Sequence, residues 1–455
     1  MQAPSVPAGA VALRWGVLGA LYAAVSGALL AMALPPYDVP LLEFLAFAPL
    51  LVAVWRMPRY TALPYALITA GVAGLALTGL PFTAHDSYDY LALVPFGVFG
   101  AFLGLTLMGA CRLGAAGGWA TVLGVGAIGV LCEWLAARVD FPYTVAFTLW
   151  RDAPLLWLAG WVGVWGLAFL VWAVNTAVAQ AWAQGRITTP LKLLAGALVV
   201  LHALGWLQMH LPHTRETVRV AVVQGRSDIY PELIRQAKAQ GAQIVVLPEV
   251  SWNVPHASAA ARQHQVWLIF GHWSDRNCAS LAAPDGSVSE PYYKMYPYGG
   301  EPRSWQAGEP VRAFRSPFET LGAVICYDTM FTEPCRQQAL NGARLIAVPT
   351  HDPTTPNLAF HYLHGATTTL RAAEHRVPMA RSEYSAASMI VDEWGRIRAY
   401  APPHEPLTIA DVPLGSGRGT LASRVGDGFI LGYALLAVGV FLYRRRNIPT
   451  LAQEG

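Results

Sequence analysis

The chain has 455 residues and a formal net charge of +3; 54% of its residues are hydrophobic and only 13% are charged. Its mean hydropathy is +0.38. Soluble globular proteins carry about 25% charged residues, so the composition excludes an ordinary soluble protein and indicates a chain that lies largely in lipid. The five cysteines are too few and too scattered for a disulfide framework or a zinc site.

Apolar segments are unevenly distributed along the chain. Crossing the hydrocarbon core of a membrane takes roughly 17–25 apolar residues. Seven candidate segments precede residue 210, and an eighth closes the chain: 13–34, 40–55, 62–81, 91–111, 117–137, 154–182, 190–208 and 427–443. We therefore predict a polytopic α-helical membrane bundle of about eight helices, with seven in residues 1–210, a soluble domain at 211–426, and a last helix with its tail at 427–455.

The first apolar segment could also be a signal peptide. Only one basic residue, Arg14, precedes its apolar run, and Leu34-Pro35-Pro36 is a poor small-residue cleavage site. We expect a retained helix.

Charges in the short loops indicate the orientation of the bundle, because cytoplasmic loops carry an excess of lysine and arginine. With the N-terminus inside, the inner loops hold the basic residues Arg56, Arg59, Arg112, Arg186, Lys192 and Arg444 to Arg446. The outer loops hold Asp38, Asp86 and Asp89, and then a mixed set of Arg138, Asp140, Arg151 and Asp152. Eight helices return the C-terminus to the inside, so we expect the soluble domain to face outward.

The soluble domain alternates between predicted strands and predicted helices. Strands are expected at 218–224, 243–249, 266–271, 322–326, 344–349, 378–391 and 407–412, with a hairpin at 278–295. Helices are expected at 231–240, 256–265 and 357–374. This alternation favours an α/β domain over an all-β receptor domain.

Three reactive residues stand where predicted strands end, namely Glu249, Lys294 and Cys326. Strand ends are the usual place for chemistry in α/β proteins. Each residue alone has an ordinary explanation; a cysteine after an apolar strand, for example, is most often a small buried hydrophobe. Together they suit acyl chemistry, because a thiol needs a base before it attacks a carbonyl and the resulting oxyanion needs a fixed positive donor.

In this order and with these flanks, the three residues resemble the Glu-Lys-Cys triad of the nitrilase superfamily, whose catalytic domain is an α-β-β-α sandwich. The whole chain resembles the bacterial apolipoprotein N-acyltransferase family, which places this domain between the last two of eight membrane helices. Further resemblances lie in the membrane part and just before the last helix: GALLAMALPPYDVPLLEFLAFAPLL, Glu133-Trp134-Leu135, Phe141-Pro142-Tyr143, Val162-Gly-Val-Trp-Gly-Leu-Ala-Phe169 and Thr420-Leu-Ala-Ser-Arg-Val-Gly-Asp427.

That family transfers an acyl chain from a phospholipid to the α-amine of a diacylglyceryl-cysteine lipoprotein. The resemblance implies that Glu249 is the general base, Lys294 the oxyanion stabiliser and Cys326 the nucleophile of a ping-pong reaction through a thioester. It also implies supporting roles at the oxyanion or substrate for Glu301, Tyr327 and Asp328.

The implied partners are a phospholipid acyl donor, a lipoprotein acceptor and the bilayer. The implied location is the bacterial inner (cytoplasmic) membrane, with the catalytic domain on the periplasmic side. We expect no cofactor, no metal ion and no nucleic-acid partner, and we expect a monomer.

Three features depart from the family pattern. The family places Pro-Phe-Gly-Glu eight residues past the lysine, whereas Glu301 follows Lys294 by seven residues with an extra glycine. Asp328 stands where the family has glutamate, and residues 350–356 replace an Asn-Asp-x-Trp-Phe stretch. The triad survives these changes, but acceptor recognition is left open.

Alternatives remain for the function and for the histidines. A membrane-anchored amidase or nitrilase-type hydrolase would share the triad, and the acceptor could be a different amine. A catalytically inactive relative that binds lipid is disfavoured by the intact triad. Four histidines have metal-like spacing, but we expect no completed carboxylate–histidine constellation and assign them capping, surface and packing roles: His351, His361, His364 and His375.

Overall fold

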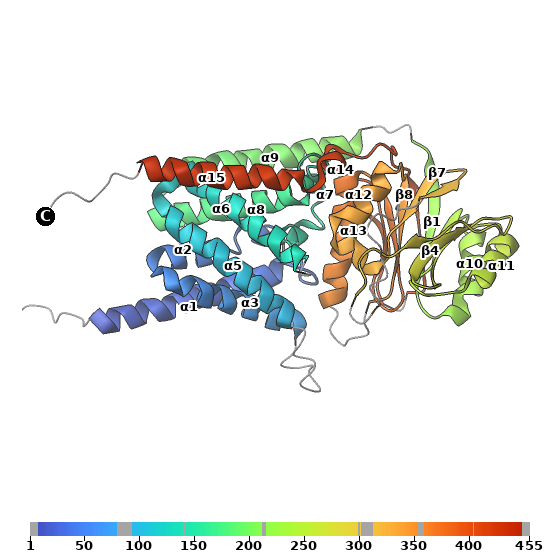
Figure 1. Cartoon of the computed structure of the whole chain (residues 1–455), viewed down its shortest axis with the longest axis horizontal. Coiled ribbons are helices and arrows are strands. Elements are labelled where there is room, and N and C mark those ends of the chain that lie inside the picture. Colours follow the sequence, from blue (N-terminus) through green and yellow to red (C-terminus); the bar gives the residue numbers. More distant parts are fainter. Residues whose placement is uncertain are drawn as a thin grey trace, which may run out of the picture. The chain divides into compact units, whose positions relative to one another are not determined.

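The computed structural model describes residues 8–79, 93–139, 142–211, 215–298, 301, 313–352, 359–403 and 405–447. The chain forms two compact units (Figure 1). The first comprises residues 1–148, 165–200 and 427–455, and the second comprises residues 149–164 and 201–426.

Helices make up the first unit. Their bounds are α1 (Ala8–Ala33), α2 (Ala48–Arg56), α3 (Ala62–Thr78), α5 (Val94–Leu113), α6 (Gly118–Arg138) and α15 (Phe429–Asn447), together with the parts of α8 (Ala159–Gln184) and α9 (Thr189–His210) that fall within it. In the described part of the chain, seven segments are long and apolar enough to cross a membrane, and α2 is not among them. The predicted membrane bundle is confirmed.

The second predicted segment is too short to span a membrane as one helix, yet the chain crosses the bundle there. α2 has 9 residues, or about 13 Å of helix. α1 and α3 run parallel, because Tyr65 Oη donates to Gly16 O while Thr69 Oγ1 donates to Ala23 O, seven residues further along α1. Neighbouring helices that run in the same direction need a connection that returns through the bundle. The chain between α1 and α3 therefore makes a crossing.

Main-chain N–H and C=O groups of this irregular crossing form hydrogen bonds with side chains of other helices. Residues 46–54 are all buried, and unpaired backbone groups at membrane depth are tolerated only inside protein. Asn175 on α8 donates to Glu43 O across 2.7 Å and accepts from the Phe47 N–H across 2.8 Å. Ser26 Oγ accepts from the Leu50 N–H. A short helix can thus cross because its neighbours replace the missing helical bonds.

Two six-stranded sheets form the second unit. The first sheet has the order β12 (Leu407–Pro413), β1 (Thr217–Val223), β2 (Ile244–Val246), β3 (Trp267–Trp273), β4 (Asn277–Ala282), β5 (Tyr292–Tyr293). The second has the order β11 (Ile397–Ala401), β10 (Ser388–Val391), β9 (Met379–Glu383), β8 (Leu345–Thr350), β7 (Glu319–Ala323), β6 (Phe314–Ser316). β1, β2 and β3 pair in parallel, as do β7, β8 and β9.

Side chains of β1 show how the layers are built, because successive residues of a strand face opposite sides. Val220 and Val222 join a core shared with the second sheet, whereas Ala221 and Val223 face a second core under helices α10 (Tyr230–Ala239) and α11 (Val254–His264). Helices α12 (Thr332–Leu340) and α13 (Ala359–His375) lie against the second sheet (Figure 1). The result is the predicted α-β-β-α sandwich.

The prediction of a single strand at 378–391 is wrong. The run 378–391 is two antiparallel strands, β9 and β10, joined by a turn. The Glu383 carboxylate accepts from the main-chain N–H groups of Ser385 and Ala386 and so closes the turn. The sequence misleads here because the turn residues, Tyr384 to Ala387, include no glycine or proline to mark the break between the strands.

Candidate active site

Glu249, Lys294 and Cys326 all follow strands, as predicted. Glu249 lies three residues after β2, Lys294 directly after β5, and Cys326 three residues after β7. The first two come from one sheet and the third from the other. Their exposed fractions are only 4%, 4% and 6%, so three reactive groups are largely removed from water.

The Lys294 ammonium is held between two carboxylates. Its Nζ lies 2.8 Å from Glu249 Oε1 and 2.9 Å from Glu301 Oε2. Burial alone would lower the pKa of Lys294, but the negative charges of Glu249 and Glu301 outweigh it and raise that pKa above its ordinary value. A permanently charged ammonium is therefore available at this position.

Both oxygens of Glu249 have donors. Oε1 accepts from Asn277 Nδ2 at 2.6 Å as well as from Lys294, and Oε2 accepts from the main-chain N–H of His351 at 3.0 Å. Close approach of β3 fixes the backbone, because a Cβ at Gly271 would lie only 2.7 Å from Glu249 Cα. Gly271 is therefore required, because a larger residue at this position would displace the backbone of Glu249.

Cys326 occupies a strained backbone conformation. Its φ is +48°, and the residue after Glu249, Val250, has φ of +46°. Side chains with a Cβ rarely adopt this left-handed region, and such strain clusters at functional sites. Cys326 opens a short 3-10 helix, Cys326–Met330, directly beyond the strand. The Cys326 thiol is thereby presented on a sharp turn.

Burial and the Glu249 charge raise the pKa of the Cys326 thiol well above its usual value, against the lowering effect of Lys294. The thiol is therefore protonated at neutral pH and needs a base. Its Sγ has weak contacts at 3.9 Å with His351 O and Asp352 Oδ1. Among the described residues, no hydrogen bond joins Sγ to Glu249, although the two groups interact electrostatically. Catalytic hydrogen bonds are often formed only when substrate is bound.

Asp328 connects the lysine segment to the cysteine turn. The side chain is fully buried, and its carboxylate accepts from three main-chain N–H groups and from one hydroxyl: Met295 N, Tyr296 N, Ile325 N and Tyr292 Oη. Burial raises the pKa of Asp328 to about 6, in spite of these hydrogen bonds and of Lys294. Every partner donates, so the ionised carboxylate is the form that fits.

The other two supporting residues also lie near the triad. Glu301 reaches Lys294 in spite of its shifted spacing, and it accepts from Tyr298 N as well. The Tyr327 ring packs against the rings of Tyr298 and Phe331. Residues 299–300 and 353–356, whose loops depart from the family pattern, lie outside the described residues.

Sequence reasoning missed Asn277 and Asp352. Asn277 Nδ2 donates to Glu249 Oε1 and to Glu301 Oε1, so it supports both carboxylates. The sequence feature that could have revealed Asn277 is its position as a polar residue at the start of an otherwise apolar strand. Asp352 accepts from His364 Nδ1 at 2.6 Å and contacts His361 Nδ1 at 3.3 Å. The expectation that no carboxylate–histidine constellation is completed is therefore wrong.

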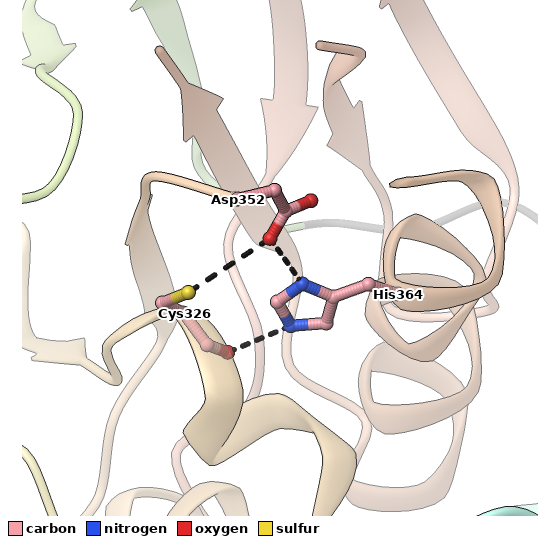
Figure 2. A group of neighbouring side chains, drawn as sticks. All are labelled: Cys326, Asp352 and His364. Carbon is pink, nitrogen blue, oxygen red and sulfur yellow. Dashed lines mark hydrogen bonds and ion pairs between the residues drawn. The ribbon is translucent and has the colours of Figure 1, made fainter. Parts of the chain in front are cut away.

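The ligand atoms of Cys326, Asp352 and His364 lie within 4.8 Å of one another, close enough to hold a metal ion (Figure 2). Asp352 Oδ2, however, also accepts from Arg381 Nη2 at 2.8 Å. The guanidinium supplies at this carboxylate the positive charge that a metal would bring. The donor set fits a hydrogen-bonded network better than a metal centre.

Two stacked sheets between layers of helices are the fold of a carbon-nitrogen hydrolase, and the buried Glu249, Lys294 and Cys326 form its candidate site. Residues 219–420 match the family described as carbon-nitrogen hydrolase, and residues 26–177 match the apolipoprotein N-acyltransferase N-terminal domain. The chain belongs to the apolipoprotein N-acyltransferase family of the nitrilase superfamily.

Two curated relatives that match nearly the whole chain carry the name apolipoprotein N-acyltransferase. The chain is 26% identical to the apolipoprotein N-acyltransferase of Geobacter metallireducens, over 94% of this chain and 96% of that protein. It is 27% identical to the enzyme of the same name from Gloeobacter violaceus, over 95% of each chain. A solved amidase from Nesterenkonia sp. is 21% identical, with a TM-score of 0.38 over 45% of this chain and 93% of that one.

Proposed function

We propose that this protein moves a fatty acyl chain from a phospholipid to the α-amine of the diacylglyceryl-cysteine of an apolipoprotein. Acyl transfer in lipoprotein maturation is the activity named for its full-length relatives. The observation that carries the proposal is a buried Glu249–Lys294 pair beside Cys326 in a chain with seven apolar spans among its described residues.

In the first half-reaction, Cys326 Sγ attacks the ester carbonyl carbon and its proton passes to Glu249. Negative charge develops on the carbonyl oxygen, where Lys294 Nζ stabilises it together with the main-chain N–H of Tyr327. The intermediate collapses, the ester C–O bond breaks, and the lysophospholipid oxygen takes the proton back from Glu249. The acyl chain is left as a thioester on Cys326.

In the second half-reaction, the lipoprotein amine attacks the thioester carbonyl and gives a proton to Glu249. Collapse of this second intermediate breaks the C–S bond and forms the amide. Cys326 leaves as the thiolate and regains its proton from Glu249. Glu301 keeps the Lys294 ammonium in place throughout, and Asp328 positions the two segments that carry Lys294 and Cys326.

A membrane bundle suits this chemistry because removing an acyl chain from lipid costs about 0.8 kcal/mol per CH₂, on the order of 10 kcal/mol for a common chain. A site beside the bilayer avoids most of that cost. We propose that residues 1–210 and 427–455 lie in and at the bacterial inner membrane, and that residues 211–426 face the periplasm. The basic inner loops described above support this orientation. We further propose that the chain acts as a monomer.

The acceptor distinguishes a transferase from an amidase-type hydrolase, whose acyl group would pass to water. Purified protein loaded with phospholipid should give an N-acyl product with a diacylated lipopeptide that has a free α-amine. The same lipopeptide with an acetylated amine should give none. Release of free fatty acid at one rate with either peptide would favour the hydrolase.

A further inference from the structure

A buried network lies behind the nucleophile and is not used in the steps above. Resting on the proposed function, we infer that His364, held by Asp352, is a positioning residue that fixes the main chain of Cys326 in its reactive conformation. Figure 2 shows the three side chains, with His364 on α13, Asp352 just beyond β8 and Cys326 at the start of its turn.

His364 bonds to the nucleophile's own backbone. Its Nε2 lies 3.0 Å from Cys326 O, and its Nδ1 lies 2.6 Å from Asp352 Oδ1 (Figure 2). All three residues are almost fully buried. The imidazole ring is therefore held at one nitrogen by a carboxylate and lies with the other against the cysteine carbonyl.

Charges around Asp352 suit this arrangement. Arg381 Nη2 donates to Asp352 Oδ2 at 2.8 Å and lies 3.3 Å from His364 Nδ1. Burial raises the pKa of Asp352, but His364 and Arg381 outweigh it and lower that pKa below its usual range. Glu383 accepts from the Asp352 main-chain N–H and adds a second carboxylate to the network. The anchor of His364 is thus ionised and held from both sides.

The strained turn needs such an anchor. A left-handed conformation is unfavourable for a residue that has a Cβ, so Cys326 at φ of +48° persists only where its surroundings hold it. The main-chain N–H of Asp328 donates to Ile325 O, in the peptide group before Cys326. In the peptide group after it, the Cys326 carbonyl bonds to His364. Thr329 Oγ1 also donates to this carbonyl. With the peptide groups on both sides fixed, the thiol keeps its direction toward the substrate.

His361 provides a matched control. It lies one turn earlier on α13, is buried like His364, and contacts the other oxygen of the same carboxylate, with Nδ1 3.3 Å from Asp352 Oδ2. Among the described residues it has no hydrogen bond to Cys326. A role in the packing of α13 would affect both histidines, whereas a role in positioning the nucleophile would single out His364.

The test measures the alkylation rate of Cys326 by iodoacetamide, followed by mass spectrometry of its peptide, in the full-length protein in detergent. His364→Ala should slow alkylation and thioester formation by about 10-fold or more, with KM for phospholipid unchanged. His364→Gln should recover part of the rate, because its amide N–H can replace Nε2. His361→Ala should stay within about 3-fold of wild type.

Wild-type rates in both His364 variants would overturn the inference, as would equal losses in the His361 and His364 variants. His364→Gln keeps the test decisive if His364→Ala unfolds, which thermal unfolding would reveal. Alkylation needs no acyl substrate. A protein that fails to acylate lipopeptide but keeps this pattern would refute the proposed function and leave the positioning role standing.

Discussion

The main-chain N–H of Met295 donates to Asp328 Oδ1 across 3.0 Å, which joins the residue after Lys294 to the residue two positions after Cys326. Lys294 and Cys326 come from different sheets, so their separation depends on this bond and on the other hydrogen bonds to the same carboxylate. Asp328 therefore links the two halves of the candidate site, namely the segment that carries Lys294 and the segment that carries Cys326.

Replacing Asp328 by asparagine should separate the two halves. The amide Nδ2 of asparagine would face N–H and O–H groups that donate hydrogen bonds to the native carboxylate, so the two segments would move apart. A shift of about 1 Å in a reacting group can cost about 10²-fold in rate. We expect single-turnover acylation of Cys326 to fall by about that factor. Asp328→Glu should not restore it, although glutamate is the family's residue, because the position is fully buried. Tyr292→Phe, which removes only one donor, should be much milder.

Acidification should have a related effect. The pKa of Asp328 is raised to about 6, so the folded protein takes up this proton near pH 6 and not near pH 4. The protonated carboxyl loses acceptor capacity among groups that all donate to it. We predict that acylation of Cys326 falls as pH drops through about 6, and that this limb is missing in Asp328→Asn. If the acylation rate of Asp328→Asn fell in the same way below pH 6, the titrating group would be a residue other than Asp328.

Glu301→Gln tests the supporting carboxylate. The Lys294 ammonium would lose one of its two negative partners, so its position and its charge would both be less secure. Transfer should slow by about 10²-fold, the scale of losing one contact at an oxyanion site. Glu290→Gln, at an exposed position of the same segment, serves as the control. Equal rates for both variants would remove Glu301 from the site.

Membrane orientation can be tested with impermeant thiol reagents on intact cells. In a background without the native cysteines, Asp285→Cys should be labelled and Asn447→Cys should not, because the basic cluster at 444–446 marks the inner side. Labelling at position 447 and protection at position 285 would reverse the orientation.

Hydropathy and strand patterns predicted most of the fold because apolar runs mark buried elements wherever they lie. The places of Glu249, Lys294 and Cys326 just beyond strands could be predicted, because each lies within three residues of the end of a strand. What the sequence could not give are contacts between distant residues: Asn175 completes the crossing at Phe47, 128 positions earlier. The same holds for Asp352 and His364, whose bond depends on how β8 and α13 meet. The left-handed backbone of Cys326 has no signal in its own residue type.

The most direct test of acyl transfer through a Cys326 thioester is the intact mass of the protein after incubation with phospholipid alone. We predict that the wild type gains one acyl mass, located on the Cys326 peptide, and keeps it until a lipopeptide with a free α-amine is added. Cys326→Ala and Glu249→Ala should gain nothing, since one lacks the nucleophile and the other the base for a thiol whose pKa is raised. An adduct that persists in Cys326→Ala, or amide product formed without any adduct on the wild type, would contradict the account.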